Sequence, residues 1–233
     1  MKFTVAAELF DKLPEACFGV VVARNMDNTV DRPEIRDLLA VQVGRVEDYY
    51  AGKKIKEAAE ILPYREAMQT LGVNPNKFMC SIEALLSRVA KKKGLPHINA
   101  AVDLGNAVSL KHLVPLGAHD LASFEGDMEV RPAVAADTFV PFGETGAEKP
   151  EAGEFVYVSG HTVRTRRWIW RQSEHGKIAS STSDIFFPLD GFKNANEAGI
   201  LAARDELARK LAEFFGCAVN TGFIDRNNRF CEL

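Results

Sequence analysis

GAHDLASFEGDMEVRPA, residues 117–133, divides the chain into two parts with different hydrophobic patterns. Before Gly117, apolar side chains recur mostly at the three- and four-residue spacing of helices. After it, short runs rich in β-branched and aromatic residues are separated by clusters of Gly, Pro, Asn or Ser, a pattern typical of strands. A helical part, a β-rich part and one further helix favour an α+β fold over a regular alternation of strands and helices.

The first part predicts one strand and four helices. Residues 17–28 form an apolar run that ends in Asn and Asp, as a buried strand followed by a turn does. Residues 31–50, 62–72, 80–94 and 98–113 have the apolar spacing of helices. We expect Ser81 to be the N-cap of the third helix, and Gly72 and Gly94 to follow the ends of the second and third.

The second part predicts five strands, a long helix and a final strand. The expected strands lie in residues 127–133, 138–143, 154–160, 162–170 and 183–192, the helix in 195–216, and the last strand in 217–225. Residues 143–153 read as a surface loop rather than a linker between domains. We therefore expect a single domain over residues 1–233.

Charge and motif content exclude several functions. The 29 basic and 32 acidic residues give a net charge of -3, which argues against a protein that binds DNA through bulk charge. No run approaches the roughly 20 apolar residues of a membrane span, and the N-terminus lacks the pattern of a signal peptide, so we expect a cytoplasmic protein with no membrane partner. The cysteines and histidines show no metal-ligand spacing, and no phosphate-binding motif occurs. We expect neither a metal nor a cofactor, and the sequence leaves the oligomeric state open.

Polar residues on either side of Gly117 form a first candidate site. Asp103 and Asn106 lie three residues apart, and therefore on one flank of the helix expected over 98–113. His119 and Asp120 follow the glycine turn. An amide, an imidazole and a carboxylate close together suit the orientation of a polar ligand. The alternative is that these groups satisfy the loop backbone at a helix end.

The segment RTRRWIWRQ, residues 164–172, forms a second candidate site because it combines four arginines with two tryptophans. On one continuous strand its side chains alternate, so Arg166, Trp168 and Trp170 share a face while Arg167 and Arg171 lie on the other. Such a strand suits stacking of a base and binding of a phosphate. The alternative is that the tryptophans pack in the core and the arginines pair with local acids.

Several segments, read in order, resemble a known family: PYREAMQTLG (63–72), SIEALLSRV (81–89), INAAVDLGNAVSL (98–110), residues 117–133 and RRWIWRQ (166–172). They resemble the B3/B4 domain, the editing module of the phenylalanyl-tRNA synthetase beta subunit. The resemblance covers roughly residues 60–190, preceded by a strand-helix extension (1–59) and followed by a helix-strand segment (191–233). Nothing resembles the other modules of the synthetase, so the chain looks like a free-standing relative.

The resemblance implies a β-rich core decorated by helices, and a pocket that hydrolyses the ester of a mischarged tRNA. By motif position, His119 and Asn106 match the catalytic pocket residues of the family. Candidate substrate-binding residues are Asp103, Asp120, Arg166, Arg167, Trp168, Trp170, Arg171 and Thr182, the last from a hydroxyl-rich run. The family's tyrosine-reading glutamate has no secure counterpart in RRWIWRQSEHGKIASSTSD (166–184), which leaves the amino acid open.

The expected partner is a tRNA acceptor end or an aminoacyl-adenosine-like ligand. Because an aminoacyl ester is already activated, a positioned water suffices. We expect His119 to orient that water or act as base, and backbone amides near the glycines to stabilise the oxyanion. Two other functions remain compatible with the sequence: a non-catalytic module that binds an amino acid, nucleotide or RNA, and a protein-interaction subunit that retains only the fold.

Overall fold

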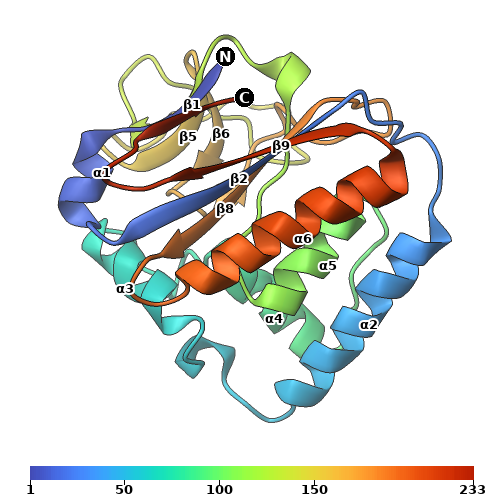
Figure 1. Cartoon of the computed structure of the whole chain (residues 1–233). Helices are drawn as coiled ribbons and strands as arrows, with labels where there is room; N and C mark the ends of the chain where they lie inside the picture. The colour runs from blue at the N-terminus through green and yellow to red at the C-terminus, as the bar shows by residue number, and fades with distance from the viewer.

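Two β-sheets and a layer of helices make up the structure, a computed structural model that describes residues 1–233 (Figure 1). The first sheet has the strand order β10-β1-β4-β5-β6-β7, and the second has the order β3-β8-β2-β9. The strands are β1 Lys2–Val5, β2 Ala16–Arg24, β3 His119–Asp120, β4 Met128–Pro132, β5 Phe155–Ser159, β6 Thr162–Arg166, β7 Arg171–Gln172, β8 Ile185–Phe192, β9 Ala218–Ile224 and β10 Phe230–Glu232. The predicted α+β fold is confirmed.

The helices lie mainly on one side of the second sheet. Helix α6 packs on β2, β8 and β9, while α5 contacts α2, α4 and α6 (Figure 1). The α-helices are α1 Ala7–Lys12, α2 Pro33–Tyr49, α3 Leu62–Thr70, α4 Ser81–Ala90, α5 Ala100–His112 and α6 Glu197–Phe215, with short 3-10 helices η1 Ile55–Glu57 and η2 Leu121–Ser123. None of the helices combines the length and apolar character needed to cross a bilayer.

Two helix ends follow from local sequence. The Asn99 side chain accepts a hydrogen bond from the Val102 N–H and caps α5, and Gly216 ends α6 in the left-handed conformation. The prediction that Ser81 caps α4 was wrong. Cys80 is the N-cap, without a side-chain hydrogen bond, because the Ser81 N–H donates to the Ile169 carbonyl and Ser81 is already the first helical residue.

Aromatic rings fill the space between the two sheets. The ring of Phe3 on β1 lies 5.9 Å from that of Phe18 on β2, 5.0 Å from that of Phe186 on β8 and 5.8 Å from that of Tyr157 on β5. The ring of His119 lies 6.1 Å from both Tyr157 and Phe186. Each aromatic side chain buries on the order of 150–250 Å², so this layer holds the sheets together and fixes the histidine in it.

The segment 162–170 is not one continuous strand, as the sequence analysis expected. Strand β6 ends at Arg166, and Arg166 pairs with Arg171 across a hairpin whose loop is residues 167–170. Arg167 and Trp168 have φ values of 46° and 60°, which end the extended backbone. The alternation of side chains predicted for RTRRWIWRQ therefore does not apply beyond Arg166.

The strand predicted over 138–143 was also wrong. Thr138, Phe139 and Pro141 make only isolated bridges, each to a different segment. Pro141 has no N–H to donate to a ladder, which limits strand pairing at this point. The segment 143–153 is a loop at the surface, as predicted.

Candidate functional site

Two adjoining hollows lie where α5, β3, β8 and the 167–170 hairpin loop meet. We call the smaller one the inner cavity, of about 80 Å³, and the larger one the outer cleft, of about 370 Å³. They share Leu116, Trp170 and Gln172. The inner cavity is also lined by His119, Tyr157, Trp168 and Asp190, and the outer cleft by Ile98, Asn106, Phe142, Arg171 and Lys177.

His119 is buried in the wall of the inner cavity as a neutral imidazole. Burial, with the nearby Arg164 guanidinium as a second cause, lowers its pKa to about 3. Its Nδ1 is buried and has no hydrogen-bond partner. A Cβ at position 117 would lie 3.3 Å from His119 Nε2. The lack of a side chain at Gly117 therefore leaves room for the His119 ring. A neutral imidazole can orient a water, but with a pKa near 3 it is a poor base at neutral pH.

Asp190 supplies a carboxyl group to the same cavity. Its Oδ1 accepts hydrogen bonds from the Tyr157 hydroxyl at 2.7 Å and the Trp168 Nε1 at 2.8 Å, and its Oδ2 has no hydrogen bond within the chain. Burial raises its pKa to about 7, against the two hydrogen bonds, which lower it. Its backbone carbonyl accepts from the Tyr64 hydroxyl at 2.9 Å. The carboxyl is therefore fixed in position and changes charge near neutral pH.

The hairpin loop brings both tryptophans to the site but uses them differently. Trp168 is fully buried, its backbone N–H donates to the Phe155 carbonyl, and its indole N–H donates to Asp190. Trp168 is closed to bulk solvent and meets only the inner cavity, which at about 80 Å³ is too small for a base, so a role in stacking a base does not fit its position. Trp170 is partly exposed and lines both the cavity and the cleft. Its ring is held by the Phe78 ring at 4.7 Å and lies under the Arg167 guanidinium at 4.8 Å.

Arg166 and Arg167 pair with acids outside the cleft, which was the alternative considered for this segment. Arg166 binds both carboxylate oxygens of Glu154, at 2.7 and 2.9 Å, and Glu148 at 3.0 Å. Arg167 binds Glu151 at 2.8 Å. Both arginines are buried, so their charge is already matched within the chain and they do not face a ligand.

Asp103, Asp120 and Thr182 also lie outside both hollows. Asp103 accepts from the Ile98 N–H and contacts His97 Nδ1. The Asp120 side chain caps η2 by accepting from the Ala122 N–H, and it also accepts from the Thr182 hydroxyl. These three side chains stabilise loop backbone, so the structure does not bring them to the candidate site.

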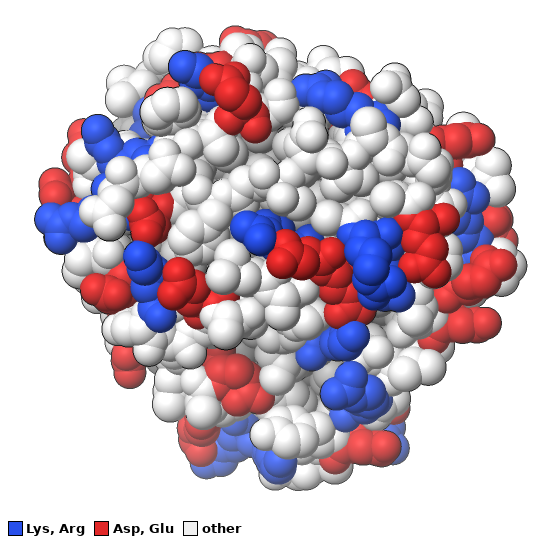
Figure 2. Space-filling model, viewed as in Figure 1, with Lys and Arg blue, Asp and Glu red and all other residues white.

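The cations that do reach the outer cleft are exposed and paired. Arg171 lies 3.1 Å from Glu144, and Lys177 contacts Glu174. Exposed pairs of this kind exchange partners readily, because they contribute at most about 1 kcal/mol. Figure 2 shows Lys and Arg interspersed with Asp and Glu on the face covered by α6, without an extended surface of one sign.

Two backbone amides of the glycine turn are engaged within the fold. The Gly117 N–H donates to the Pro188 carbonyl at 2.9 Å, and the Asp120 N–H donates to the Gly176 carbonyl at 3.0 Å. Each of these amides is thus engaged within the fold. No group of three His, Cys, Asp or Glu side chains is placed to hold a metal ion.

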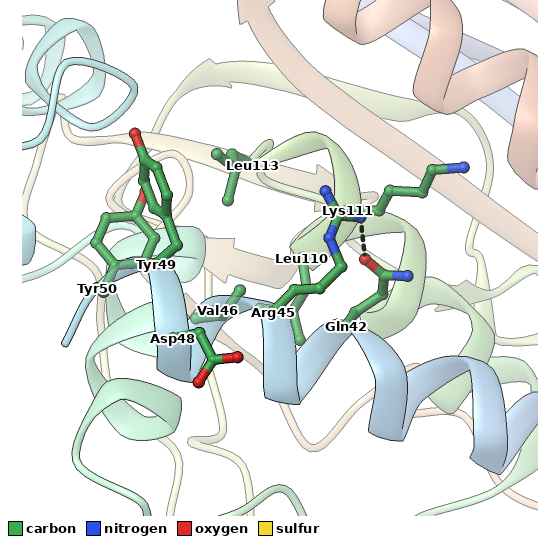
Figure 3. Close-up of a pocket in the computed structure, with 9 residues that line it drawn as sticks. All are labelled: Gln42, Arg45, Val46, Asp48, Tyr49, Tyr50, Leu110, Lys111 and Leu113. Atoms are coloured by element: carbon green, nitrogen blue, oxygen red, sulfur yellow. Dashed lines mark hydrogen bonds between the residues drawn. The ribbon is translucent and has the colours of Figure 1, made fainter.

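A larger hollow of about 560 Å³ lies between α2 and α5 (Figure 3). Its two cations have partners in the chain: Arg45 donates to the Gln42 side chain at 2.8 Å, and Lys111 binds Glu206 at 2.7 Å. Val46, Tyr49, Leu110 and Leu113 give it largely apolar walls. Its buried polar side chain, Gln42, is already paired with Arg45, and the hollow has no imidazole and carboxyl side by side as the inner cavity does.

Sequence reasoning found His119, Asn106, Trp170 and Arg171 but missed Asp190, Tyr157 and Phe142. The available signal for Asp190 was a single acid within the apolar run IFFPLDGF. A carboxylate in a buried strand is unfavourable without partners, and this marks it for attention. Its partners, Tyr157 and Trp168, are 33 and 22 residues away in the sequence, so the spacing could not identify them.

The fold and the site define an α+β domain with a small inner cavity that shares three lining residues with a wider cleft. A sequence model of the B3/4 domain matches residues 63–212, and the chain belongs to this family, as its motifs predicted. A structure described as an N-terminal fragment of the phenylalanyl-tRNA synthetase beta-subunit from Pyrococcus horikoshii is similar, with a TM-score of 0.49 and 11% identity. The similarity covers 93% of this chain and 49% of that one, so this chain spans about half its length. No curated protein matches the sequence.

Proposed function

We propose that this B3/4 domain hydrolyses the ester of a mischarged aminoacyl-tRNA, or of a related aminoacyl-adenosine. The observation that carries the proposal is the inner cavity, where a neutral imidazole and a carboxyl group that titrates near pH 7 line one enclosed space. Membership of a family that includes a tRNA-synthetase editing module supports the choice of substrate class.

The proposed reaction divides the work between Asp190 and His119. The free Oδ2 of ionised Asp190 takes a proton from a water that His119 orients, and the water oxygen attacks the ester carbonyl carbon. The bond from that carbon to the ribose oxygen then breaks, and the ribose oxygen receives the proton from Asp190. The products are a free amino acid and a ribose hydroxyl, with no net change in protons on the protein.

The size of the inner cavity limits the substrate's amino acid. About 80 Å³ is well below the 300–1,000 Å³ of pockets that enclose drug-sized ligands. We therefore propose an aminoacyl group with a small side chain, and the ammonium group of such an ester is a natural partner for the Asp190 carboxylate. A tyrosyl group would require the walls to move.

The test is a deacylation assay on a panel of alanyl, seryl, valyl and tyrosyl esters of tRNA. We expect turnover of a small aminoacyl ester that rises about tenfold per pH unit below pH 7 and then levels off, because only ionised Asp190 accepts a proton. Asp190→Asn should lower the plateau at least about 100-fold. The matched control is Asp205→Asn, at an exposed acid on α6. Turnover no faster than spontaneous hydrolysis for every ester would reject the hydrolase.

A binding module without catalysis is the second candidate. It is favoured by the engaged amides of Gly117 and Asp120, which are two donors that an oxyanion at this turn cannot use. In this case the same esters, or free amino acids and nucleotides, would raise the melting temperature while remaining intact. The deacylation assay and a thermal-shift screen on the same preparation separate the two functions.

A further inference from the structure

The hollow between α2 and α5 is separate from the candidate site. Its volume of about 560 Å³ falls within the range of small-molecule sites, and none of the residues that line it also lines the inner cavity or the outer cleft. One wall comes from α2, which ends before residue 63, where the match to the family model begins. A ligand bound in this hollow would therefore be independent of the proposed hydrolysis.

Arg45 supplies the hollow with a positive charge that no acid in the chain neutralises. Its guanidinium donates to Gln42 Oε1 at 2.8 Å and forms no ion pair within the chain. Asp48, three residues further along α2, has its carboxylate directed away from Arg45 (Figure 3). The buried Gln42 amide thus holds the guanidinium while most of its five N–H groups stay free. A planar carboxylate can accept two of them side by side.

The surface around Arg45 is mainly aliphatic. Val46, Leu110 and Leu113 line the hollow. Tyr49 lines it as well, but the Lys53 ammonium lies 3.7 Å from the centre of the Tyr49 ring and covers one face. Stacking of a flat ring needs an open aromatic face, whereas an alkyl chain follows branched aliphatic walls by rotation about its bonds. The walls therefore favour an alkyl chain over a ring.

Leu113 keeps its place in this wall at a cost to the backbone. It is the C-cap of α5, with φ of 57° and ψ of 42°, a left-handed conformation that glycine or asparagine usually supplies at a helix end. Strained backbone of this kind clusters at ligand-binding sites. The Leu113 side chain is partly buried and packs against the core while it lines the hollow. The leucine thus gives the hollow an apolar wall that glycine or asparagine would remove.

The charges nearby limit the charge of the ligand. Lys111 is already paired with Glu206 at 2.7 Å, and Asp48 adds a carboxylate to the lining. One unneutralised cation suits one negative charge, and a second negative charge would meet these two acids. We propose that this hollow binds the carboxylate of a short- or medium-chain fatty acid, with Arg45 on the carboxylate and the aliphatic wall on the alkyl chain.

The experiment titrates the full chain with butanoate, hexanoate, octanoate and octanol, and follows binding by calorimetry or ligand-observed NMR. Each added methylene group should raise the affinity of the carboxylates about two- to fourfold, as partial to full burial of that group predicts. Octanol has the same chain length as octanoate and no charge. It should bind at least about tenfold more weakly, because it lacks the charged hydrogen bonds to Arg45.

Two variants test the two halves of the site. Arg45→Gln should weaken octanoate binding at least about tenfold and leave octanol binding unchanged. Leu113→Asn should weaken both about fivefold, since asparagine tolerates the left-handed backbone and replaces the apolar wall with a polar group. Arg36→Gln is the matched control, because Arg36 is an exposed arginine of the same helix and does not line the hollow. Circular dichroism on each variant establishes that it is folded.

The outcomes do not depend on those of the deacylation assay. Octanoate binding that depends on Arg45 and on chain length would support the inference, whether or not any ester is hydrolysed. No binding at millimolar octanoate, affinity that does not change with chain length, equal affinity for octanoate and octanol, or unchanged octanoate binding in folded Arg45→Gln would each overturn it. Inorganic phosphate that binds as tightly as octanoate would also overturn it, because the site would then recognise charge alone.

Discussion

Replacing Asp190 with asparagine should change how the stability of the protein depends on pH. In the folded chain the pKa of Asp190 is raised from its ordinary value of 3.8 to about 7. Between these values the folded state holds a proton that the unfolded state has lost, so the stability contributed below pH 3.8 is lost as pH rises to about 7. The free energy of unfolding lost over this pH range through Asp190 is about 4 kcal/mol, at about 1.4 kcal/mol per pH unit.

His119 acts in the opposite direction over nearly the same range. Its pKa is lowered from 6.5 to about 3, so the unfolded state holds the extra proton between these values and stability rises with pH. In the native protein the two effects nearly cancel from pH 4 to 6.5. Asp190→Asn removes one of them and retains the carbonyl oxygen that accepts from Tyr157 and Trp168. The variant should therefore gain stability relative to the native protein as pH rises.

The assay is urea unfolding of both proteins at pH 4.5, 5.5, 6.5 and 8, followed by tryptophan fluorescence. We expect the difference in free energy of unfolding, variant minus native, to grow by about 3.5 kcal/mol between pH 4.5 and 8. Taking this difference cancels the titration of all other groups. The control Asp205→Asn should show a constant difference, because Asp205 is exposed. A constant difference for Asp190→Asn would refute the assignment of Asp190 as a buried carboxyl that titrates near neutrality.

Three further predictions concern catalysis and packing. His119→Ala should lower the deacylation rate about 100-fold without loss of fold, since it removes the group that orients the water; equal rates would exclude His119 from the reaction. Glu154→Ala leaves the buried Arg166 without its two-oxygen partner, and should lower the free energy of unfolding in urea by about 3 kcal/mol. Gly191→Ala should lower it by about 1–3 kcal/mol, because the new Cβ would lie 2.3 Å from an Ile200 carbon. Gly44→Ala, where α2 has open space, should instead raise the free energy of unfolding by up to about 1 kcal/mol. An equal loss of stability in both glycine variants would contradict the packing argument.

Most helices and strands could be predicted because their signals are local. The apolar spacing of 195–216 and its closing glycine are contained within the segment, and the same holds for the Asn-capped helix α5. The pairing order of the strands could not be predicted in this way. It depends on contacts such as β1 with β10 and β4, which join residues far apart in the chain.

The hairpin at Arg167 and Trp168 had no local signal at all. Left-handed backbone usually occurs at Gly, Asn or Asp, and neither residue is one of these. The turn is stabilised by tertiary contacts: the buried indole donates to Asp190, and the adjacent arginine side chains bind Glu151 and Glu154. For this reason the sequence supported both a stacking strand and a packed core element, and only the structure decided between them.

The energetics of this hairpin explain why the arginines and tryptophans are concentrated there. Two residues in the left-handed region cost about 1–3 kcal/mol each. Burial of the Trp168 side chain, on the order of 150–250 Å² at about 25 cal/mol per Å², contributes roughly 4–6 kcal/mol and offsets that strain. The Trp168 indole N–H donates to Asp190 Oδ1, so Oδ2 is the oxygen of the carboxyl group without a hydrogen bond in the chain. The segment thus orients the Asp190 carboxyl group in the inner cavity, while Trp170, the ring left partly exposed, lines the outer cleft.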